Sequence, residues 1–367
     1  MKQPLSVGVV GLGPWGARLA ARWSGAPGLR WLGAAERRGI DAAGGLATRS
    51  LEALLQDRPA LVLVATEPAA HEAVALRCLA AGAAVFIEKP PALDLDGLRR
   101  LEAAAGQPDR LFGSSVWLDV PMVSAWLSAA AGVSGRRAVR LVRHNPAAPA
   151  RGLDELVDLA PHDLLLLHTL QGRLADRVRA VRRPDGVRAA LRWDDDRPLQ
   201  AILDLSWQRP RRRELLLLAE GLALRAAEGP TGPMDREKEG RAGERAGERA
   251  GETTGRRDGE AGLWRGPGAP ATLLTYDEDD ALIADPVDPW PEAAAWAPLP
   301  LPVGPEPLIA EQQRILGWMA APGPAPRAAW QAQRLGVAAL EALRRSLAGD
   351  GGWVRPAAPP APTWTAG

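Results

Sequence analysis

The first third of the chain alternates between two patterns of apolar residues. Short β-branched or aliphatic runs predict buried strands at residues 5–10, 29–35, 60–65 and 83–87. Apolar positions at helical spacing predict helices at residues 17–23, 69–81 and 95–105. Strands that alternate with helices through about residue 116 indicate a parallel, doubly wound sheet, and hence an α/β fold.

The pattern changes after residue 116. It predicts a helix at roughly 120–131, a strand at 138–143 and an apolar helix at roughly 158–170. A meander of mostly antiparallel strands follows at residues 178–182, 187–193, 199–207, 214–219 and 223–226, and two closing helices at roughly 307–319 and 328–347. We therefore expect a doubly wound domain at residues 1–116, an α+β domain with an open, mostly antiparallel sheet at residues 117–355, and a Pro-rich tail at residues 356–367.

Residues 228–270 interrupt the second domain with Gly, Arg and Glu, including a repeated Arg-Ala-Gly-Glu at residues 241–252. Such a segment has too few apolar groups to offset the entropy lost on ordering. We interpret it as a disordered loop, with a docking element as the minor alternative.

Composition excludes several classes of function. The 367 residues are 46% apolar and carry a net charge of +1, so the chain is expected to be globular and to bind neither nucleic acid nor an anionic membrane surface. The single cysteine, Cys78, allows no intrachain disulfide and fits a reducing compartment. With four histidines and no paired ligand spacing, a metal site is not expected. No signal peptide and no run of about 18 apolar residues is present, so we predict a cytoplasmic protein.

Lysine is almost absent. Of 45 Lys plus Arg residues only Lys2, Lys89 and Lys238 are lysine, and Lys89 alone lies in sequence predicted to be folded. A guanidinium stays charged at any biological pH, whereas an ammonium can share or release a proton. Lys89 is therefore a candidate for chemistry, with an accident of composition as the alternative.

A glycine turn follows the first strand. Gly11, Gly13 and Gly16 precede a helix, the context in which a dinucleotide pyrophosphate approaches a helix N-terminus, with Leu12, Pro14 and Trp15 completing the turn. Glu36, twenty residues beyond Gly16, ends the second strand, where a carboxylate accepts hydrogen bonds from ribose hydroxyls. Glu36 favours NAD because it would repel a 2′-phosphate, whereas Arg37 or Arg38 could pair with that phosphate in NADP. The alternative is an ordinary glycine-rich turn beside a solvated glutamate.

Two further motifs end strands of the predicted parallel sheet. Thr66-Glu67-Pro68 and Glu88-Lys89-Pro90 lie at the carboxyl edge, where doubly wound folds bind ligands, and His71 opens the following helix. Lys89 would reach toward the nicotinamide and orient a hydroxyl or carbonyl. Glu88 is either a cofactor-binding residue or no more than a charge partner for Lys89, and His71 is either a cofactor contact or a structural histidine.

Asp158 and His162 are four residues apart where an apolar helix begins. With Asp158 as the helix cap, Pro161 falls in the first turn and both side chains share one face. The imidazole could then accept a hydroxyl proton while the carboxylate orients it, or Asp158 is simply a cap beside an unrelated histidine. His168, among leucines, is expected to pack. The sequence does not assign His144, and the Arg209–Arg213 turn is either solvated or a phosphate patch.

These motifs closely resemble the Gfo/Idh/MocA oxidoreductases along nearly the whole chain. The resemblance rests on Val9 to Gly16, Ala65 to Pro68 with His71, Ala81-Gly82 before Val85 to Pro90, and Asp158 to His162 with Asp163, supported by Leu205-Ser206-Trp207 and Glu306-Pro307-Leu308. It implies an N-terminal Rossmann domain, a C-terminal α+β domain whose open sheet forms a homo-oligomer, and a reacting carbon surrounded by Lys89, Asp158 and His162. Two departures are the short, Gly-rich segment between Glu36 and Ala60, and Ser114-Ser115-Val116-Trp117, which lacks the family's frequent Asn or Arg.

The resemblance implies an NAD(P)-dependent dehydrogenase that transfers a hydride between the nicotinamide and a secondary alcohol of a sugar, cyclitol or nucleotide sugar. One alternative is a glycosidase of the same family that uses NAD transiently. The other is a non-catalytic dinucleotide-binding or regulatory protein.

Overall fold

The computed structural model describes residues 4–36, 48–146, 153–228, 262–267, 296–321 and 324–361. The chain divides into two compact units. The first comprises residues 1–120, 150–180 and 304–367, and the second comprises residues 121–149 and 181–303. Three segments distant in sequence therefore build the first unit, which contains the predicted nucleotide-binding sheet.

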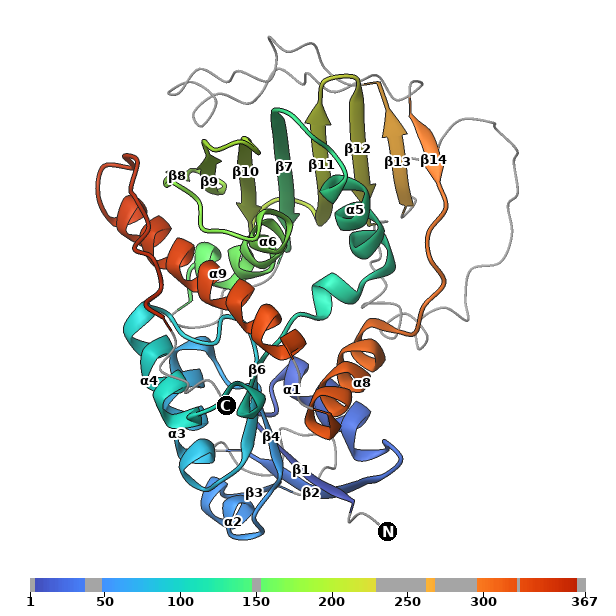
Figure 1. The fold of residues 1–367 in the computed structure, drawn as a ribbon. Coiled ribbons are helices and arrows are strands. Elements are labelled where there is room, and N and C mark those ends of the chain that lie inside the picture. Colours follow the sequence, from blue (N-terminus) through green and yellow to red (C-terminus); the bar gives the residue numbers. More distant parts are fainter. Residues whose placement is uncertain are drawn as a thin grey trace. The chain divides into compact units, whose positions relative to one another are not determined.

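The first unit is built on a parallel six-stranded sheet with the order β3-β2-β1-β4-β5-β6 (Figure 1). Its strands are β1 (Leu5–Val10), β2 (Leu29–Ala35), β3 (Thr48–Arg49), β4 (Leu61–Val64), β5 (Ala84–Ile87) and β6 (Leu111–Gly113). The reversal of order between β1 and β4 is that of a Rossmann fold, and it opens a crevice at the carboxyl edge of the sheet. The predicted doubly wound parallel sheet is confirmed.

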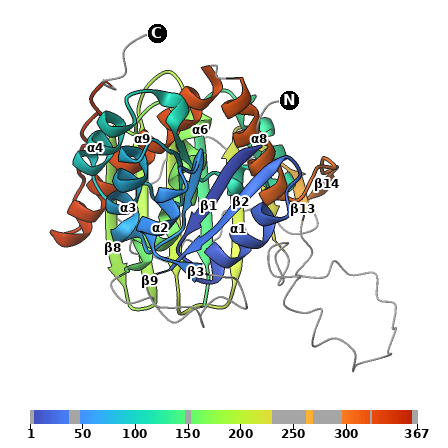
Figure 2. The same cartoon turned by 90° about the horizontal axis from the view of Figure 1, so that it is seen from below.

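Helices cover both faces of this sheet (Figure 2). One face packs against α1 (Pro14–Ser24) and α8 (Pro307–Ala320). The other packs against α2 (Leu51–Gln56), α3 (Pro68–Ala80), α4 (Leu95–Ala105) and α9 (Pro324–Ala348). Because both faces are covered, the central strands β4 and β5 are buried along their whole length, which explains their continuous apolar sequence.

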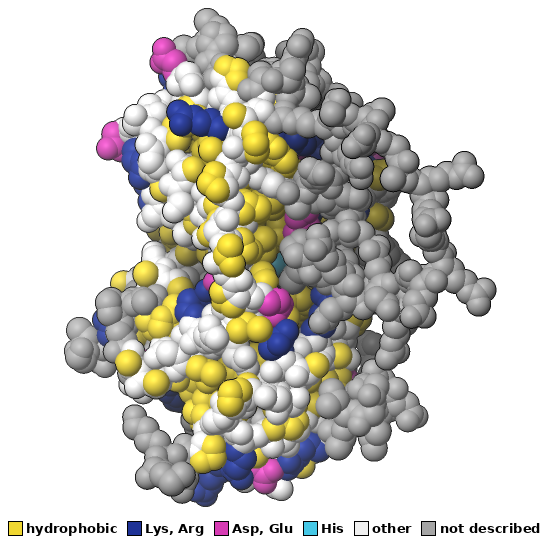
Figure 3. All heavy atoms as spheres, turned by 90° about the vertical axis from the view of Figure 1, so that its right-hand side faces the viewer, with side chains coloured by type: hydrophobic (Ala, Val, Ile, Leu, Met, Phe, Trp, Pro, Cys, Tyr) yellow, Lys and Arg dark blue, Asp and Glu magenta, His cyan; other side chains and the backbone are white. Residues whose placement is uncertain are grey.

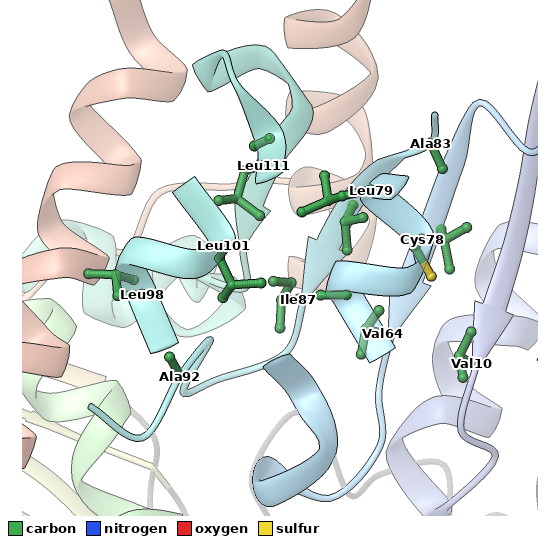
Figure 4. Packing of buried hydrophobic residues seen from close by; sticks show 14 of the residues in the cluster. Val10, Val64, Cys78, Leu79, Ala83, Ile87, Ala92, Leu98, Leu101 and Leu111 are labelled. Carbon is green, nitrogen blue, oxygen red and sulfur yellow. The ribbon is translucent and has the colours of Figure 1, made fainter. Parts of the chain in front are cut away.

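The core on the second of these faces joins the sheet to α3 and α4. Figure 4 shows Val64 and Ile87 of the sheet beside Cys78 and Leu79 of α3 and Leu101 of α4. Cys78 is fully buried, and its burial raises the pKa of the thiol to about 12. It therefore packs as a small apolar side chain rather than reacting as a thiolate.

The second unit contains α5 (Pro121–Ala131) and an eight-stranded sheet with the order β14-β13-β12-β11-β7-β10-β9-β8. Its strands are β7 (Arg137–His144), β8 (Arg177–Arg183), β9 (Gly186–Trp193), β10 (Leu199–Ser206), β11 (Arg212–Ala219), β12 (Leu222–Ala227), β13 (Gly262–Gly266) and β14 (Ala297–Leu299). One of the pairings, between β10 and β7, is parallel. The others are antiparallel: β10 pairs with β9, β11 pairs with β7 and with β12, and β13 pairs with β12 and with β14. The mostly antiparallel sheet is confirmed.

The prediction of a disordered loop over residues 228–270 is wrong at both ends. Glu228 lies against Arg211 and Arg213, and residues 262–266 form β13. Leu263 is buried, and the Arg225 guanidinium lies 5.3 Å from the centroid of the Trp264 ring. The strand pairs with β12 on one side and with β14 on the other. Residues 229–261 and 268–270 lie outside the described residues.

Two surface properties bear on the expected function classes. Among the described residues, no helix combines the length and apolar character needed to span a bilayer. On the face shown in Figure 3, basic and acidic side chains of the described residues occur in small, separate groups among apolar ones. This face therefore shows no broad field of one sign.

Candidate functional site

The glycine turn after β1 is shaped by close backbone approaches. Gly11 has φ of +92°, and a Cβ atom there would lie 2.6 Å from the Ala65 carbonyl oxygen. A Cβ atom on Gly16 would lie 1.9 Å from the Gly11 carbonyl oxygen, whereas one on Gly13 would meet nothing within 4 Å. Gly11 and Gly16 thus close the turn, and Gly13 leaves space where a pyrophosphate can approach the backbone.

Helix α1 begins at this turn without a side-chain cap. Gly13 is its N-cap, which makes no side-chain capping hydrogen bond, and Pro14 follows. The N–H groups of that turn and the positive end of the helix dipole form an anion site. The shape of the glycine turn and the N-terminus of α1 both fit the pyrophosphate of a dinucleotide.

Glu36 reaches from the end of β2 to the same turn. The Leu12 N–H donates to Glu36 Oε2 at 2.8 Å, which fixes the carboxylate beside the glycines. A carboxylate in that place can accept hydrogen bonds from the adenosine ribose hydroxyls. Arg37, proposed as a partner of the 2′-phosphate, and Arg38 lie outside the described residues.

Thr66, Glu67 and Pro68 carry the chain from β4 into α3, with Glu67 at the N-cap. His71 is 1% exposed, and its ring lies between two carbonyl oxygens, with Nε2 2.9 Å from that of Thr66 and Nδ1 2.8 Å from that of Pro90. Burial lowers the pKa of His71, and the neutral ring donates to one of these carbonyls. His71 therefore links the ends of β4 and β5, and its proposed contact with cofactor stays a prediction.

Glu88 lies beneath the glycine turn rather than on the Lys89 ammonium. The Trp15 indole N–H donates to Glu88 Oε1 at 2.6 Å, and the Lys89 backbone N–H donates to Glu88 Oε2 at 3.3 Å. Burial raises the pKa of the Glu88 carboxyl, and the hydrogen bond from Trp15 opposes that shift. Glu88 thus connects the cofactor turn to the backbone that carries Lys89.

The Lys89 side chain points to the first turns of α6 (Glu155–Gln171). Its Nζ donates to the Asp158 carbonyl oxygen at 2.7 Å and lies 3.3 Å from Asp158 Oδ1. His162 is one helical turn further along the same face, and its ring lies 6.4 Å from that of Trp117 between centroids. The structure therefore brings Lys89 to Asp158, one helical turn before the proposed base His162.

The prediction that Asp158 caps this helix is wrong. Asp154 is the N-cap, accepting a hydrogen bond from the Val157 N–H at 2.8 Å, so the helix starts one turn earlier. Pro161 is consequently inside the helix rather than in its first turn. Asp158 and His162 still lie on the same face of α6, because both residues are helical and four positions apart.

A buried acidic group beside the site escaped the sequence analysis. Glu311 of α8 is 2% exposed and accepts a hydrogen bond from the Ser115 N–H at 2.6 Å, just beyond β6. Burial, and then the nearby charge of Glu88, raise the pKa of Glu311 to about 8. The sequence carries a signal: Glu311 is three residues after Leu308 and four before Ile315, on the apolar face of the helix.

Other candidate residues have structural partners. His168 is 1% exposed, its Nδ1 lies 2.7 Å from the Leu164 carbonyl oxygen, and burial lowers its pKa to about 4, so its predicted packing role is confirmed. In the second unit Arg209 pairs with Asp185 and Asp204, and His144 Nε2 lies 3.6 Å from Asp204 Oδ1. Within the described ranges no three His, Cys, Asp or Glu side chains form a cluster able to hold a metal ion.

Comparison with known proteins agrees with this geometry. Residues 5–114 match the Gfo/Idh/MocA family, described as an oxidoreductase family with an NAD-binding Rossmann fold. The predicted resemblance of this region to the Gfo/Idh/MocA oxidoreductases is therefore confirmed. A search of curated proteins gave no match.

Solved structures of similar fold extend over the whole chain. UDP-N-acetylglucosamine 3-dehydrogenase from Acidithiobacillus ferrooxidans is 20% identical, with a TM-score of 0.65 over 94% of this chain and 97% of its own. Myo-inositol dehydrogenase from Lactobacillus casei, solved with NAD(H) and myo-inositol, is 17% identical, with a TM-score of 0.65 over 98% of each chain. GenD2 of gentamicin A biosynthesis, solved with NAD, is 22% identical, with a TM-score of 0.66 over 98% of each chain. At these identities the similarity establishes a shared fold.

Proposed function

We propose that this protein is an NAD(P)-dependent dehydrogenase that transfers a hydride between the nicotinamide and a secondary alcohol of a sugar, cyclitol or nucleotide sugar. The observation that carries the proposal is the contact of Lys89 Nζ with Asp158, 2.7 Å from its carbonyl oxygen, at the carboxyl edge of an NAD-binding sheet. A protein that only binds a dinucleotide does not need a lysine held against an aspartate, with a histidine one helical turn further along.

The chain's own residues divide the work of an alcohol oxidation. His162 accepts the hydroxyl proton as general base. Asp158 orients that imidazole from the preceding turn, and Lys89, anchored on Asp158, polarises the oxygen of the reacting alcohol. NAD(P), when bound, supplies the hydride acceptor. Glu36 and the glycine turn would hold its ribose and pyrophosphate.

The substrate class is supported by the proteins of similar fold, whose names specify a nucleotide sugar and a cyclitol. NAD is favoured over NADP because the Glu36 carboxylate lies at the ribose end of the turn, where a 2′-phosphate would be repelled. A homo-oligomer formed through the open sheet of the second unit remains part of the proposal.

A cofactor and substrate panel tests this function. We would follow nicotinamide absorbance with NAD and NADP against myo-inositol, free hexoses and UDP-N-acetylglucosamine, in wild type and Lys89→Ala, with Lys2→Ala as the matched lysine control. We expect turnover in wild type and Lys2→Ala and a loss of about 10²- to 10³-fold in Lys89→Ala. NAD affinity should change far less.

Three outcomes would contradict the proposal. NAD binding with no turnover across the panel would indicate a non-catalytic dinucleotide-binding protein. Glycoside cleavage with no net change in nicotinamide absorbance would indicate an NAD-dependent glycosidase. Equal kcat in wild type and Lys89→Ala would remove Lys89 from the reaction.

A further inference from the structure

We propose that Trp117 is a positioning residue that holds the His162 imidazole in its reactive orientation. The inference rests on the proposed function for its catalytic consequence. Trp117 lies in the segment Ser114-Ser115-Val116-Trp117, which lacks the Asn or Arg that the family resemblance led us to expect there.

The two rings are in direct contact range. Their centroids lie 6.4 Å apart and their planes are tilted by 52°, within the separations typical of interacting aromatic rings. Rotation of a histidine ring about its second side-chain torsion is otherwise broad. An indole against one side of the ring restricts this rotation, and it does so on the residue proposed to accept the proton.

Trp117 is itself rigidly held. It lies in a 3-10 turn (Val116–Asp119) that α8 contacts at both ends, and α9 contacts the residue Ser114 before it. The Ser115 N–H donates to Glu311, the Arg314 guanidinium donates to Ser115 Oγ at 2.7 Å and pairs with Asp119, and Gln333 donates to the Ser114 carbonyl at 2.7 Å. The turn that carries the indole is thus tied to two helices.

Burial excludes a direct contact between most of this ring and substrate. Trp117 is 2% exposed, so it offers no face on which a sugar ring could stack. Its effect on the reaction must pass through another side chain, and His162 is the ring it contacts. This makes Trp117 a positioning residue rather than a catalytic one.

The test compares Trp117→Leu and Trp117→Phe with Trp23→Leu in the full-length protein. Trp23, also 2% exposed, lies in the last turn of α1 and packs in the core of the same unit, so Trp23→Leu controls for the loss of a buried indole. Melting temperatures would show that each variant folds. Imidazole resonances of the four histidines, with His162 assigned by His162→Gln, would be recorded with and without NAD.

In Trp117→Leu we expect His162 signals that are shifted and split or broadened by ring reorientation. Trp117→Phe should keep one set, and Trp23→Leu should leave these signals unchanged. With myo-inositol or UDP-N-acetylglucosamine as probe, kcat in Trp117→Leu should fall about 10- to 100-fold while KM and NAD affinity change less than about twofold. Trp117→Phe should restore most of the rate.

The NMR measurement tests the positioning role of Trp117, and the kinetic measurement also tests the proposed dehydrogenase activity. A single, sharp His162 signal set in Trp117→Leu, or an unchanged kcat, would overturn the positioning role. If no probe is turned over by wild type while Trp117→Leu splits the His162 signals, the positioning role stands and the dehydrogenase proposal fails.

Discussion

The two units bury charged side chains in different ways. In the second unit a single carboxylate, that of Asp204, faces Arg140 and Arg188 on neighbouring strands and Arg209 in the turn after β10, at 3.3–3.6 Å. Glu214 likewise pairs with Arg212 and Arg225. At the carboxyl edge of the first unit two buried carboxyls, Glu88 and Glu311, lie near each other with pKa values raised by burial, and the nearby cations are Lys89 and Arg314.

This difference between the units distinguishes charged side chains that stabilise the fold from charged side chains that are suited to proton transfer. Arginine stays protonated at every biological pH, and its pairs across the second sheet fix strands without exchanging protons. A carboxyl whose pKa is raised by burial, as that of Glu311 is to about 8, can change protonation near neutral pH, which is typical of functional sites. Each of the following experiments tests one side of this comparison.

Removing the carboxylate of Asp204 should have the largest effect on stability. Although burial alone would raise its pKa, His144 and the surrounding arginines hold the pKa of Asp204 below its usual value, so its contribution is present above pH 4 and is lost as pH falls. Asp204→Asn leaves the buried Arg188 facing a neutral amide, and should cost about 3 kcal/mol in the free energy of unfolding, measured in urea.

The exposed Asp196→Asn serves as the control and should change stability by less than about 0.5 kcal/mol. NAD affinity should be the same in wild type and both variants. A cofactor affinity that falls in Asp204→Asn alone would show that the network in the second sheet serves the site, contrary to the comparison.

Exchanging the two cations tests their roles directly. Lys89→Arg keeps the charge but replaces a compact ammonium, 2.7 Å from the Asp158 carbonyl oxygen, by a larger guanidinium that cannot share its proton. We expect kcat to fall about 100-fold with little loss of stability. Arg188→Lys, the reciprocal exchange in the second unit, should cost about 1–2 kcal/mol of stability and leave kcat unchanged.

Steady-state kinetics and urea unfolding of both variants provide the measurement. A Lys89→Arg enzyme with wild-type kcat would mean that any cation suffices at this position. The presence of lysine at position 89 would then be an accident of composition and not a requirement of the reaction.

The sequence predicts the first sheet well because parallel strands buried on both faces leave long apolar runs between glycines and helix starts. The residues 5–10 and 29–35 predicted as strands are those of β1 and β2. It misplaces the start of α6 because Asp154 and Asp158 both suit a cap, and burial of Leu156 and Val157 decides for Asp154. It misses Glu311 because the partner, Ser115, is 196 residues away, and such burial follows only from the packing of α8.

The raised pKa of Glu311 predicts a pH dependence of stability. A carboxyl whose folded pKa is about 8, against 4.5 in the unfolded chain, holds its proton more tightly when folded. Stability is therefore greatest below pH 4.5 as far as this group is concerned, and decreases as pH rises toward 8. In Glu311→Gln the neutral amide can still accept from the Ser115 N–H, so the variant should lose this slope and gain about 2 kcal/mol at pH 8 relative to wild type.

Urea unfolding at pH 5, 6.5 and 8 gives the slope for wild type and Glu311→Gln. Glu102→Gln is the contrast, because Glu102 is equally buried but pairs with Arg334 at 2.7 Å. Its substitution removes the partner of a buried guanidinium and should destabilise the protein at all three pH values. Parallel stability curves for wild type and Glu311→Gln would show that Glu311 is ionised in the folded protein, and the carboxyl edge would then bury balanced charge as the second sheet does.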